Sequence, residues 1–352
     1  MTRPTLARLL AAGLFVALVV AAALVPVPYV TVSPGITVDV LGRSGDQPIV
    51  KVEGHRTYPT DGQLRMTTVS VSKPEHHVSL GEALTAWASD DDAVMPRDVM
   101  YPDASTDQQE TAQSAAEMLT SQEGAVAAAL SELGYRLPTY AEITGVTPDG
   151  PSDGELKPRD RLVRAVGRRI RTGDDLIAAL KRLEPGEQVS GVVRRNGKRV
   201  PFEVTTTESP QLPGQAVMGV FVGTGYEFPF DVSVAIDDSI GGPSAGLVFA
   251  LSVYDTLTPG SLTGGAKVAG TGTISADGRV GPIGGIQQKI AAAADAGAEL
   301  FLVPPANCDS AVAAPDDALD RMQLVKARSL RSALRSIKAY ADDPSADLPR
   351  CA

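Results

Sequence analysis

The chain opens with an apolar run, Leu9 to Val25, that contains no charged residue. Arg3 and Arg8 precede this run, and the next basic residue is Arg43. Because basic residues collect on the cytoplasmic side of a membrane segment, the asymmetry predicts a cytoplasmic N-terminus and an extracytoplasmic remainder. The run is intermediate in length between a signal-peptide core and a full span, so a cleaved leader and an uncleaved anchor both fit. We favour an anchor over residues 1–28, and hence a single-pass protein of the cell membrane.

Composition excludes several classes of function. A chain of 352 residues is long enough for two or three domains. Its net charge of −10 and its aromatic content of 5% argue against nucleic acid as a partner. Two cysteines and three histidines supply no metal-ligand cluster, so we expect neither a metal nor a cofactor. Cys308 and Cys351 can pair outside the cytoplasm, but the sequence decides neither this pairing nor the oligomeric state, and a homo-oligomer stays open.

Residues 29–134 carry the signals of a mixed region. Alternating hydrophobicity predicts strands at Ile49 to Val52 and Leu64 to Val71. The acidic segment Ser89 to Gln109 is typical of a solvated loop. A Thr-x-x-Gln capping box then predicts a helix over Asp107 to Leu133. We expect this α/β region to pack against the C-terminal domain.

Residues 135–207 read as strand, turn, strand, helix, strand, strand, with a hairpin at Asn196-Gly197. The most distinctive segments of this unit are Val146-Thr147-Pro148, Leu156 to Leu162, Val166 to Ile170 and Val192 to Gly197. Together they resemble a PDZ domain of the bacterial protease type. The unit departs from the family pattern at Ser152, where alanine is usual, and at Arg159, where glycine is usual.

The resemblance to a PDZ domain implies capture of an extended peptide along a sheet edge, often by its terminal carboxylate. The unit is also locally basic. Its arginines can hold acidic peptide ends or form a solvated face, and the sequence does not separate the two readings. These arginines are Arg161, Arg164, Arg168, Arg169 and Arg171.

A serine lies in a glycine-rich turn before an apolar helix, in the block Gly242 to Gly246. Proline at the preceding position suits a first helical turn, so the helix is expected to start at Pro243-Ser244. The block fits the nucleophile-elbow pattern G-x-S-x-G, which demands a downstream histidine. The last histidine, His77, lies far upstream. We therefore set aside a Ser-His-Asp site built from the three histidines at positions 55, 76 and 77.

A second helix carries a lysine within its apolar stripe. Gly284-Gly285 opens this helix and Gly297 ends it, and Lys289 shares a face with Ile286 and Ile290. Burying an ammonium is costly unless it is paired or neutral, and burial lowers the pKa of a lysine. A lysine with a lowered pKa can act as a general base near neutral pH. The alternative is a lysine that reaches out to water.

The serine block, the lysine block and the strand after them occur together as Gly242 to Gly246, Pro282 to Lys289 and Leu300 to Pro304. Their succession resembles the proteolytic domain of the Lon family over roughly residues 217–337, and we place this domain at 215–340, before a flexible tail at 341–352. The resemblance implies an α/β domain with Ser244 as nucleophile and Lys289 as base. It also places Thr271 where the family has a threonine that hydrogen-bonds the lysine.

Two departures from the Lon family qualify the resemblance. The sequence contains no P-loop, which implies hydrolysis without ATP and substrates that are flexible or unfolded. Gly241 also stands where a related form of the motif has an acidic residue. A serine–lysine pattern at Ser70 to Lys73 is set aside, because the other motifs of penicillin-binding proteins are missing.

Anchor, PDZ unit and Lon-like domain together resemble the membrane-anchored PDZ-containing Lon-like proteases of bacteria. We therefore predict an α+β serine endopeptidase that hydrolyses peptides through an acyl-enzyme. One rival is a catalytically inactive peptide-binding or chaperone-like module with the same fold. Another is a Ser-Lys signal peptidase, which would place its serine close after the anchor, whereas Ser244 lies far along the chain.

Overall fold

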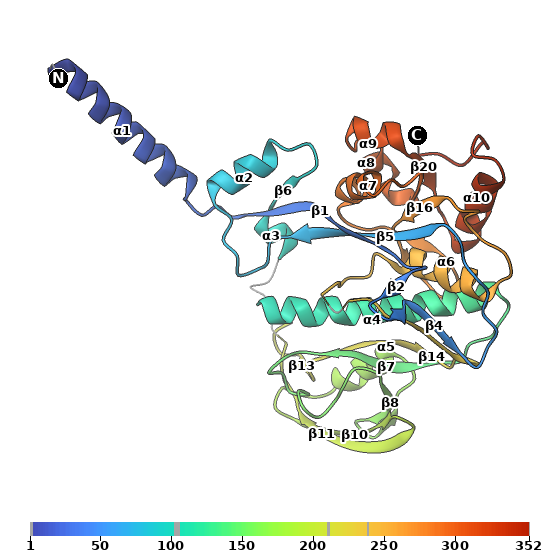
Figure 1. Ribbon diagram of the computed structural model, residues 1–352. Coiled ribbons are helices and arrows are strands. Elements are labelled where there is room, and N and C mark those ends of the chain that lie inside the picture. The colour runs from blue at the N-terminus through green and yellow to red at the C-terminus, as the bar shows by residue number, and fades with distance from the viewer. Residues whose placement is uncertain (1–2, 102–105, 210–211, 238, 352) are drawn as a thin grey trace.

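The computed structural model describes residues 3–101, 106–209, 212–237 and 239–351. Residues 102–105 of the predicted acidic loop and Asp238, just ahead of the serine turn, lie outside the described residues. Figure 1 shows three parts: a projecting N-terminal helix, a mixed α/β body, and a smaller β-rich domain that lies below the body in this view.

The body is built on a six-stranded sheet with the order β20-β19-β16-β5-β1-β6. Its parallel strands β5, β16, β19 and β20 lie side by side, and β1 and β6 add antiparallel pairs. Region 29–134 therefore does more than pack against the C-terminal domain, since the two regions share one hydrogen-bonded sheet. The bounds are β1 (Tyr29–Asp39), β5 (Gln63–Val71), β6 (Ala93–Pro96), β16 (Lys267–Gly270), β19 (Leu300–Val303) and β20 (Gln323–Lys326).

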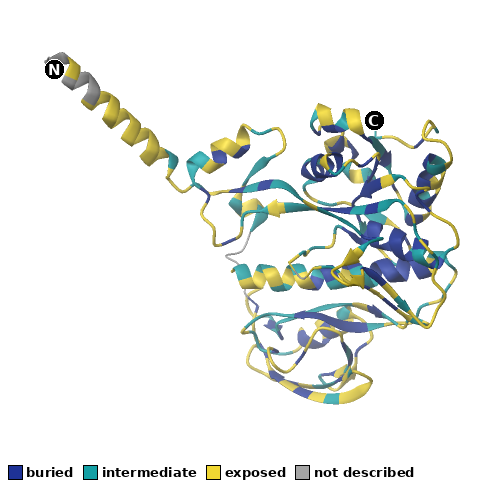
Figure 2. Ribbon diagram, viewed as in Figure 1, coloured by how far each residue is buried: buried dark blue, intermediate teal, exposed yellow. Residues whose placement is uncertain are grey.

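Helices cover both faces of this sheet. Successive side chains of β19 alternate between the two hydrophobic cores that lie on these faces. Leu300 and Leu302 belong to the core that includes α4, α6 and α10, whereas Phe301 and Val303 belong to the core beneath α7, α8 and α9. Successive strand residues point to opposite faces, so a strand buried on both sides is apolar throughout. Figures 1 and 2 show these layers, with α6 almost wholly buried. The helices are α4 (Asp107–Glu132), α6 (Gly246–Leu257), α7 (Ile286–Asp295), α8 (Cys308–Ala311), α9 (Asp316–Arg321) and α10 (Leu330–Asp342).

The second sheet has the order β11-β10-β8-β7-β14, with β9 beside β8. The predicted hairpin is confirmed, since Arg195 pairs with Lys198 and both turn residues, Asn196 and Gly197, have positive φ. β14 lies beyond the predicted boundary at residue 207, in a stretch assigned to the protease domain, because its backbone pairs with β7. The elements are β7 (Thr139–Val146), β8 (Asp160–Ala165), β9 (Arg168–Arg169), α5 (Gly173–Leu180), β10 (Gln188–Arg195), β11 (Lys198–Thr205) and β14 (Val220–Tyr226).

Short elements complete the described chain. The acidic segment Ser89 to Gln109 is not all loop, because β6 pairs with β1 and is followed by a short helix, α3. Four two-stranded pairs join β2 to β3, β4 to β15, β12 to β13 and β17 to β18. Their bounds, with those of the short helices, are β2 (Arg43–Ser44), β3 (Gln47–Pro48), β4 (Val50–Glu53), α2 (Leu80–Trp87), α3 (Arg97–Met100), β12 (Thr207–Glu208), β13 (Ala216–Val217), β15 (Asp231–Val234), β17 (Thr273–Ile274), β18 (Val280–Gly281) and η1 (Pro305–Asn307).

The N-terminal helix α1 (Arg3–Ala23) projects away from the body (Figure 1). Apolar side chains along it are largely exposed, among them Leu14, Phe15 and Leu18. Within the described ranges, no helix combines the length and the apolar character needed to cross a membrane.

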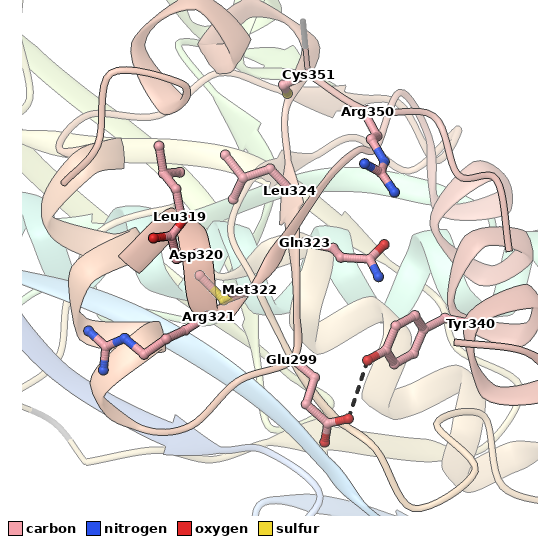
Figure 3. A pocket seen from close by; sticks show the side chains of 10 residues that line it. All are labelled: Glu299, Leu319, Asp320, Arg321, Met322, Gln323, Leu324, Tyr340, Arg350 and Cys351. Atoms are coloured by element: carbon pink, nitrogen blue, oxygen red, sulfur yellow. Dashed lines mark hydrogen bonds between the residues drawn. The ribbon is translucent and has the colours of Figure 1, made fainter. Parts of the chain in front are cut away.

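The C-terminal segment is not the flexible tail that its polar sequence predicted. Leu348 is buried, and the amide of Lys326 donates to the carbonyl of Pro349 at 2.6 Å. Cys351 forms a disulfide with Cys308. Figure 3 shows Arg350 and Cys351 beside Leu324 of β20, so the segment covers the free edge of the large sheet.

Removing the disulfide should lower stability, because the bond closes a segment with a sequence separation of 43 residues. A loop of that length restricts the unfolded chain by up to about 4 kcal/mol. Urea unfolding of Cys351→Ser, compared with the wild type under oxidising conditions, measures the loss. A reductant should bring the wild type to the level of the variant and leave the variant unchanged. Equal midpoints without reductant would contradict the expectation.

Candidate active site

Ser244 lies in a turn directly in front of α6, not in the first turn of that helix as the sequence predicted. α6 begins at Gly246, with Ala245 as its N-cap. The carbonyl of Ser244 accepts hydrogen bonds from the amide of Gly272, at 2.8 Å, and from Thr271 Oγ1, at 3.0 Å. These bonds tie the Ser244 backbone to the segment after β16. The backbone hydrogen bonds of α6 therefore begin only after Ser244.

Helix α4 holds this turn from the other side. The amide of Gly242 donates to the carbonyl of Ser114 at 2.9 Å, and Ser121 Oγ donates to the carbonyl of Pro243 at 3.1 Å. A Cβ atom on Gly241 would lie 2.1 Å from Ser114 Oγ, so only glycine fits there. An acidic side chain at that position would therefore require Ser114 or α4 to shift.

Ser114 and Ser121 were not among the site residues predicted from the sequence. The two serines are seven residues apart and so share one face of α4. Met118 lies on the same helix and lines the same cavity as Ser244. The spacing of the two serines was the sequence signal that could have pointed to them. Such spacing shows that two residues share a helix face, but it does not show which segment packs against that face.

Lys289 reaches the site from α7, where Ile286 and Ile290 are also buried. Lys289 is 2% exposed. Its Nζ atom lies 2.6 Å from Ser244 Oγ and 3.3 Å from Thr271 Oγ1. Burial lowers the pKa of Lys289 to about 8, because removal from water disfavours the ammonium form. Of the two readings that the sequence allowed, the structure has the buried lysine.

The three residues predicted from the sequence, Ser244, Thr271 and Lys289, therefore lie together. The hydroxyl of Thr271 donates to the Ser244 carbonyl and accepts from Lys289 Nζ. In the described part of the chain, no carboxylate forms a salt bridge with Lys289. No ion pair of that kind offsets the desolvation, so a larger fraction of the amine is neutral than in an exposed lysine, with a lone pair available to the Ser244 hydroxyl.

The alternative catalytic groups lie elsewhere. The ring of His55 stacks on Phe230 at 4.3 Å, and His76 Nε2 lies 3.3 Å from Glu82. Ser70 of β5 borders the same cavity as Ser244, but Lys73 lies beyond the end of that strand and is exposed. Among the described side chains, Lys289 is thus the ionisable group in contact with Ser244.

Ser244 and Lys289 both line a cavity of about 560 Å³. The cavity lies between the bulged part of β1, strand β5 and the serine turn, and apolar side chains form much of its wall. Its described lining residues are Pro34, Gly35, Ile36, Met66 to Ser70, Met118, Ser239 to Gly241, Ser244, Ala245 and Lys289.

A second cavity, of about 1060 Å³, runs between α5 and β14 of the smaller domain. β14 is an edge strand of its sheet. None of the five basic-patch arginines at 161, 164, 168, 169 and 171, all described, lines this cavity. Arg161, for example, pairs with Glu227 and lies over the ring of Tyr140. Of the two readings of the patch, the structure therefore favours the solvated face.

Two known families match parts of this chain. The family model of the Lon protease (S16) C-terminal proteolytic domain matches residues 236–338. The PDZ domain model matches residues 122–206. The chain thus contains a Lon-type proteolytic domain and a PDZ domain in a mixed α/β structure, which supports a serine peptidase.

Individual relatives match short stretches of the chain. A Lon protease of Lachnoclostridium phytofermentans is 42% identical over 66 residues, which are 19% of this chain and 8% of the relative. A Lon protease of Azorhizobium caulinodans is 34% identical over 84 residues, which are 24% of this chain and 10% of the relative. The chain spans about a tenth of the length of the curated relatives it matches.

Solved structures with low similarity to the chain include PDZ domains. The PDZ domain of an SdrC-like protein from Listeria monocytogenes is 15% identical and covers 24% of this chain and 86% of its own, with a TM-score of 0.22. We draw nothing from similarity at that level.

The burial of Lys289 should cost stability in a pH-dependent way. Its pKa falls from 10.5 to about 8 on folding, a difference worth roughly 3 kcal/mol. Between these two values the unfolded chain binds the extra proton, so the free energy of unfolding rises with pH across that window. Lys289→Met lacks this penalty. It should be more stable than the wild type at pH 7, and the advantage should shrink as the pH rises from about 8 to 10.5.

Chemical unfolding of both proteins across this range measures the difference. Lys198→Met, at an exposed position on β11, is the matched control and should differ from the wild type by a constant amount. A Lys289→Met advantage that does not change with pH would show that the lysine is not desolvated.

Proposed function

We propose that this chain is a serine endopeptidase in which Ser244 is the nucleophile and Lys289 the general base. The observation that carries the proposal is the 2.6 Å separation of Lys289 Nζ and Ser244 Oγ, with the lysine buried and its pKa lowered to about 8. A neutral amine at hydrogen-bond distance from a hydroxyl is the arrangement that general-base activation of a serine requires.

The reaction proceeds in two halves. Neutral Lys289 takes the proton of the Ser244 hydroxyl while Ser244 Oγ forms a bond to the carbonyl carbon of the scissile peptide. The tetrahedral adduct collapses, the C–N bond breaks, and the leaving amine takes the proton from the Lys289 ammonium. Water then attacks the acyl-enzyme, again with Lys289 as base, and the bond from the acyl carbon to Ser244 Oγ breaks as the Lys289 ammonium returns its proton to that oxygen.

The surrounding backbone limits which groups can stabilise the oxyanion. Pro243 has no N–H. The amide of Gly242 is already bonded to the Ser114 carbonyl. The amide of Leu247 is likewise bonded, to the Gly272 carbonyl, so the amides of residues 244–246 are the remaining donors of this turn; they lie near the N-terminus of α6, which favours negative charge. Thr271 orients the amine by accepting from it while its own hydroxyl is held by the Ser244 carbonyl.

Substrates of the proposed enzyme are flexible or unfolded polypeptides, because the sequence contains no P-loop and thus no sign of ATP-driven unfolding. We assign the catalytic unit to residues 29–134 together with the region after the PDZ domain, since both contribute to the same sheet. The PDZ domain is proposed to capture peptides along β14, by adding a strand to its edge.

The rival function is a peptide-binding or chaperone-like module without catalysis. Such a module would keep both cavities and the PDZ groove. It would have no use for a lysine buried at a cost beside a serine, and this is why we favour the enzyme.

Ser244→Ala and Lys289→Met should each abolish cleavage of an unfolded protein substrate, with losses of at least about 100-fold, the scale of positioned acid–base groups. The double variant should lose no more than either single one, because both residues serve one step. Thr271→Val should lose less, roughly 10–100-fold, since it orients the base without accepting the proton. Wild-type activity should rise with pH to a half-maximum near pH 8, where Lys289 becomes neutral.

An active-site-directed phosphonylating probe provides the control, since it should label Ser244 in the wild type and not in Ser244→Ala. Lys198→Met serves as the lysine control and should cleave normally. Full activity of Lys289→Met would refute the dyad. A chain that binds peptides but neither cleaves them nor reacts with the probe would be the non-catalytic module.

We also propose that the N-terminal segment tethers the catalytic domain to the outer face of the cell membrane. Support comes from the uncharged run Leu9 to Val25, from the arginines that precede it, and from the exposed apolar side chains of α1. The disulfide Cys308–Cys351 adds support, because such bonds persist in oxidising compartments.

The full-length protein should therefore stay in the membrane pellet after alkaline carbonate extraction, and protease added to spheroplasts should digest the C-terminal domain. Replacing two apolar residues in the middle of the run, such as Phe15→Asp and Leu18→Asp, should release the chain. Extraction of the wild type by carbonate would refute the tether, and protection from external protease would reverse its orientation.

A further inference from the structure

The groove along β14 is built from two parts of the chain that lie far apart in sequence. The PDZ domain supplies one side, from α5 and from the strand itself. The other side comes from α3 and from the first turns of α4, which belong to the region before the PDZ domain. The described contributors include Leu176, Ile177, Leu180 and Ala216 to Val222 on the first side, and Val99, Met100, Gln109, Glu110 and Gln113 on the second.

Most of this lining is apolar or neutral. Among the described residues that line the groove, Glu110 is the charged one. It is partly exposed, and in the described part of the chain no salt bridge involves it. Glu110 lies in the first turn of α4, where a negative charge also suits the helix dipole. The helix dipole accounts for a negative charge in this turn, but it does not account for the position of Glu110 on the wall of the groove.

The edge of β14 sets how a ligand would lie. Within the described elements β14 pairs with β7 and ends the sheet, so the N–H and C=O groups of its other edge can bond an added strand. A peptide bound there is extended, and every second side chain points the same way. Some of these side chains would therefore meet the apolar face of α5, and others would approach α4.

The charge of the groove differs from that of the rest of the PDZ domain. The arginines of the basic patch line no part of it, whereas the approach from α4 is negative at Glu110. A cationic side chain on the peptide would find a partner on this wall, and a carboxylate would meet repulsion.

We infer that the groove selects an extended, largely apolar peptide that carries a lysine or arginine opposite Glu110. The inference rests on the proposed capture of peptides along β14 and adds the class of peptide. The protease half of the molecule thus supplies the charge recognition, while the PDZ half supplies the edge strand and the apolar face.

The size of the effect follows from the partial exposure of Glu110. An exposed ion pair is worth about 0.2–1 kcal/mol, so the cationic residue should tighten binding by roughly 1.5- to 5-fold. Added salt should reduce this gain, because exposed charges are screened.

The test uses the full-length Ser244→Ala chain, so that bound peptides are not cleaved. The probes are fluorescent apolar peptides of seven residues, the length of β14, with lysine moved through each position of a norleucine background. A parallel set carries glutamate in place of lysine. Fluorescence anisotropy gives the affinity of each peptide. One position, or two positions on the same side of the strand, should favour lysine over norleucine and disfavour glutamate.

In Glu110→Gln the lysine preference should vanish while the norleucine peptide binds as before. In Glu110→Lys the preference should reverse toward glutamate. Glu203→Gln, on the opposite edge strand β11, makes the same change of charge in an exposed position and should leave the lysine preference intact. Peptides that bind without any dependence on lysine or on Glu110 would overturn the inference and leave peptide capture standing. Failure of every peptide to bind would overturn peptide capture and the inference together.

Discussion

The buried amine of Lys289 is the constraint on which the site depends. An ammonium in that position is poorly solvated and, among the described residues, without an ionic partner, so the pKa falls to about 8 and the neutral form becomes accessible near neutral pH. The neutral form is useful only if a proton donor stands within reach, and Ser244 Oγ does so at 2.6 Å. Three elements must meet to produce this contact: α7 on one face of the sheet, the turn before α6 on the other, and the end of β16 between them.

Helix α4 connects the two halves of the molecule. Its middle holds the serine turn through Ser114 and Ser121, and Met118 lines the cavity of the dyad. Its first turns line the groove of the PDZ domain. The same helix therefore borders both the proposed capture site and the proposed cleavage site. A peptide held along β14 lies against the element that positions Ser244, which gives the PDZ domain a role beyond that of a loosely attached binding module.

The proteolytic fold here is completed by strands that precede the PDZ domain. β1, β5 and β6 continue the sheet of β16, β19 and β20, and β5 also lines the cavity of the dyad. The PDZ domain is thus an insertion between two segments of one unit. The family match at residues 236–338 covers only the second segment. The first segment is as much a part of the site, because Ile36 and Met66 shape the space in front of Ser244.

Structural features that depend on only a few neighbouring residues were determined by the sequence alone. The capping box at Thr106, the hairpin at Asn196-Gly197 and the lysine in an apolar stripe are local patterns, and the structure has all three. The triad of Ser244, Thr271 and Lys289 came from resemblance to a family, and the structure brings these residues together.

Only the tertiary structure decided which distant segments pair. The edge strand β14 joined the PDZ sheet, the C-terminal segment packed through Leu348 and Cys351, and α4 approached the serine turn. Each of these contacts joins residues that are far apart in the chain. Periodicity and capping act over a few residues and shape single elements. Which distant segments pair depends on the whole core. Apolar side chains are buried and backbone groups are paired only when the complete sheet and its covering helices assemble.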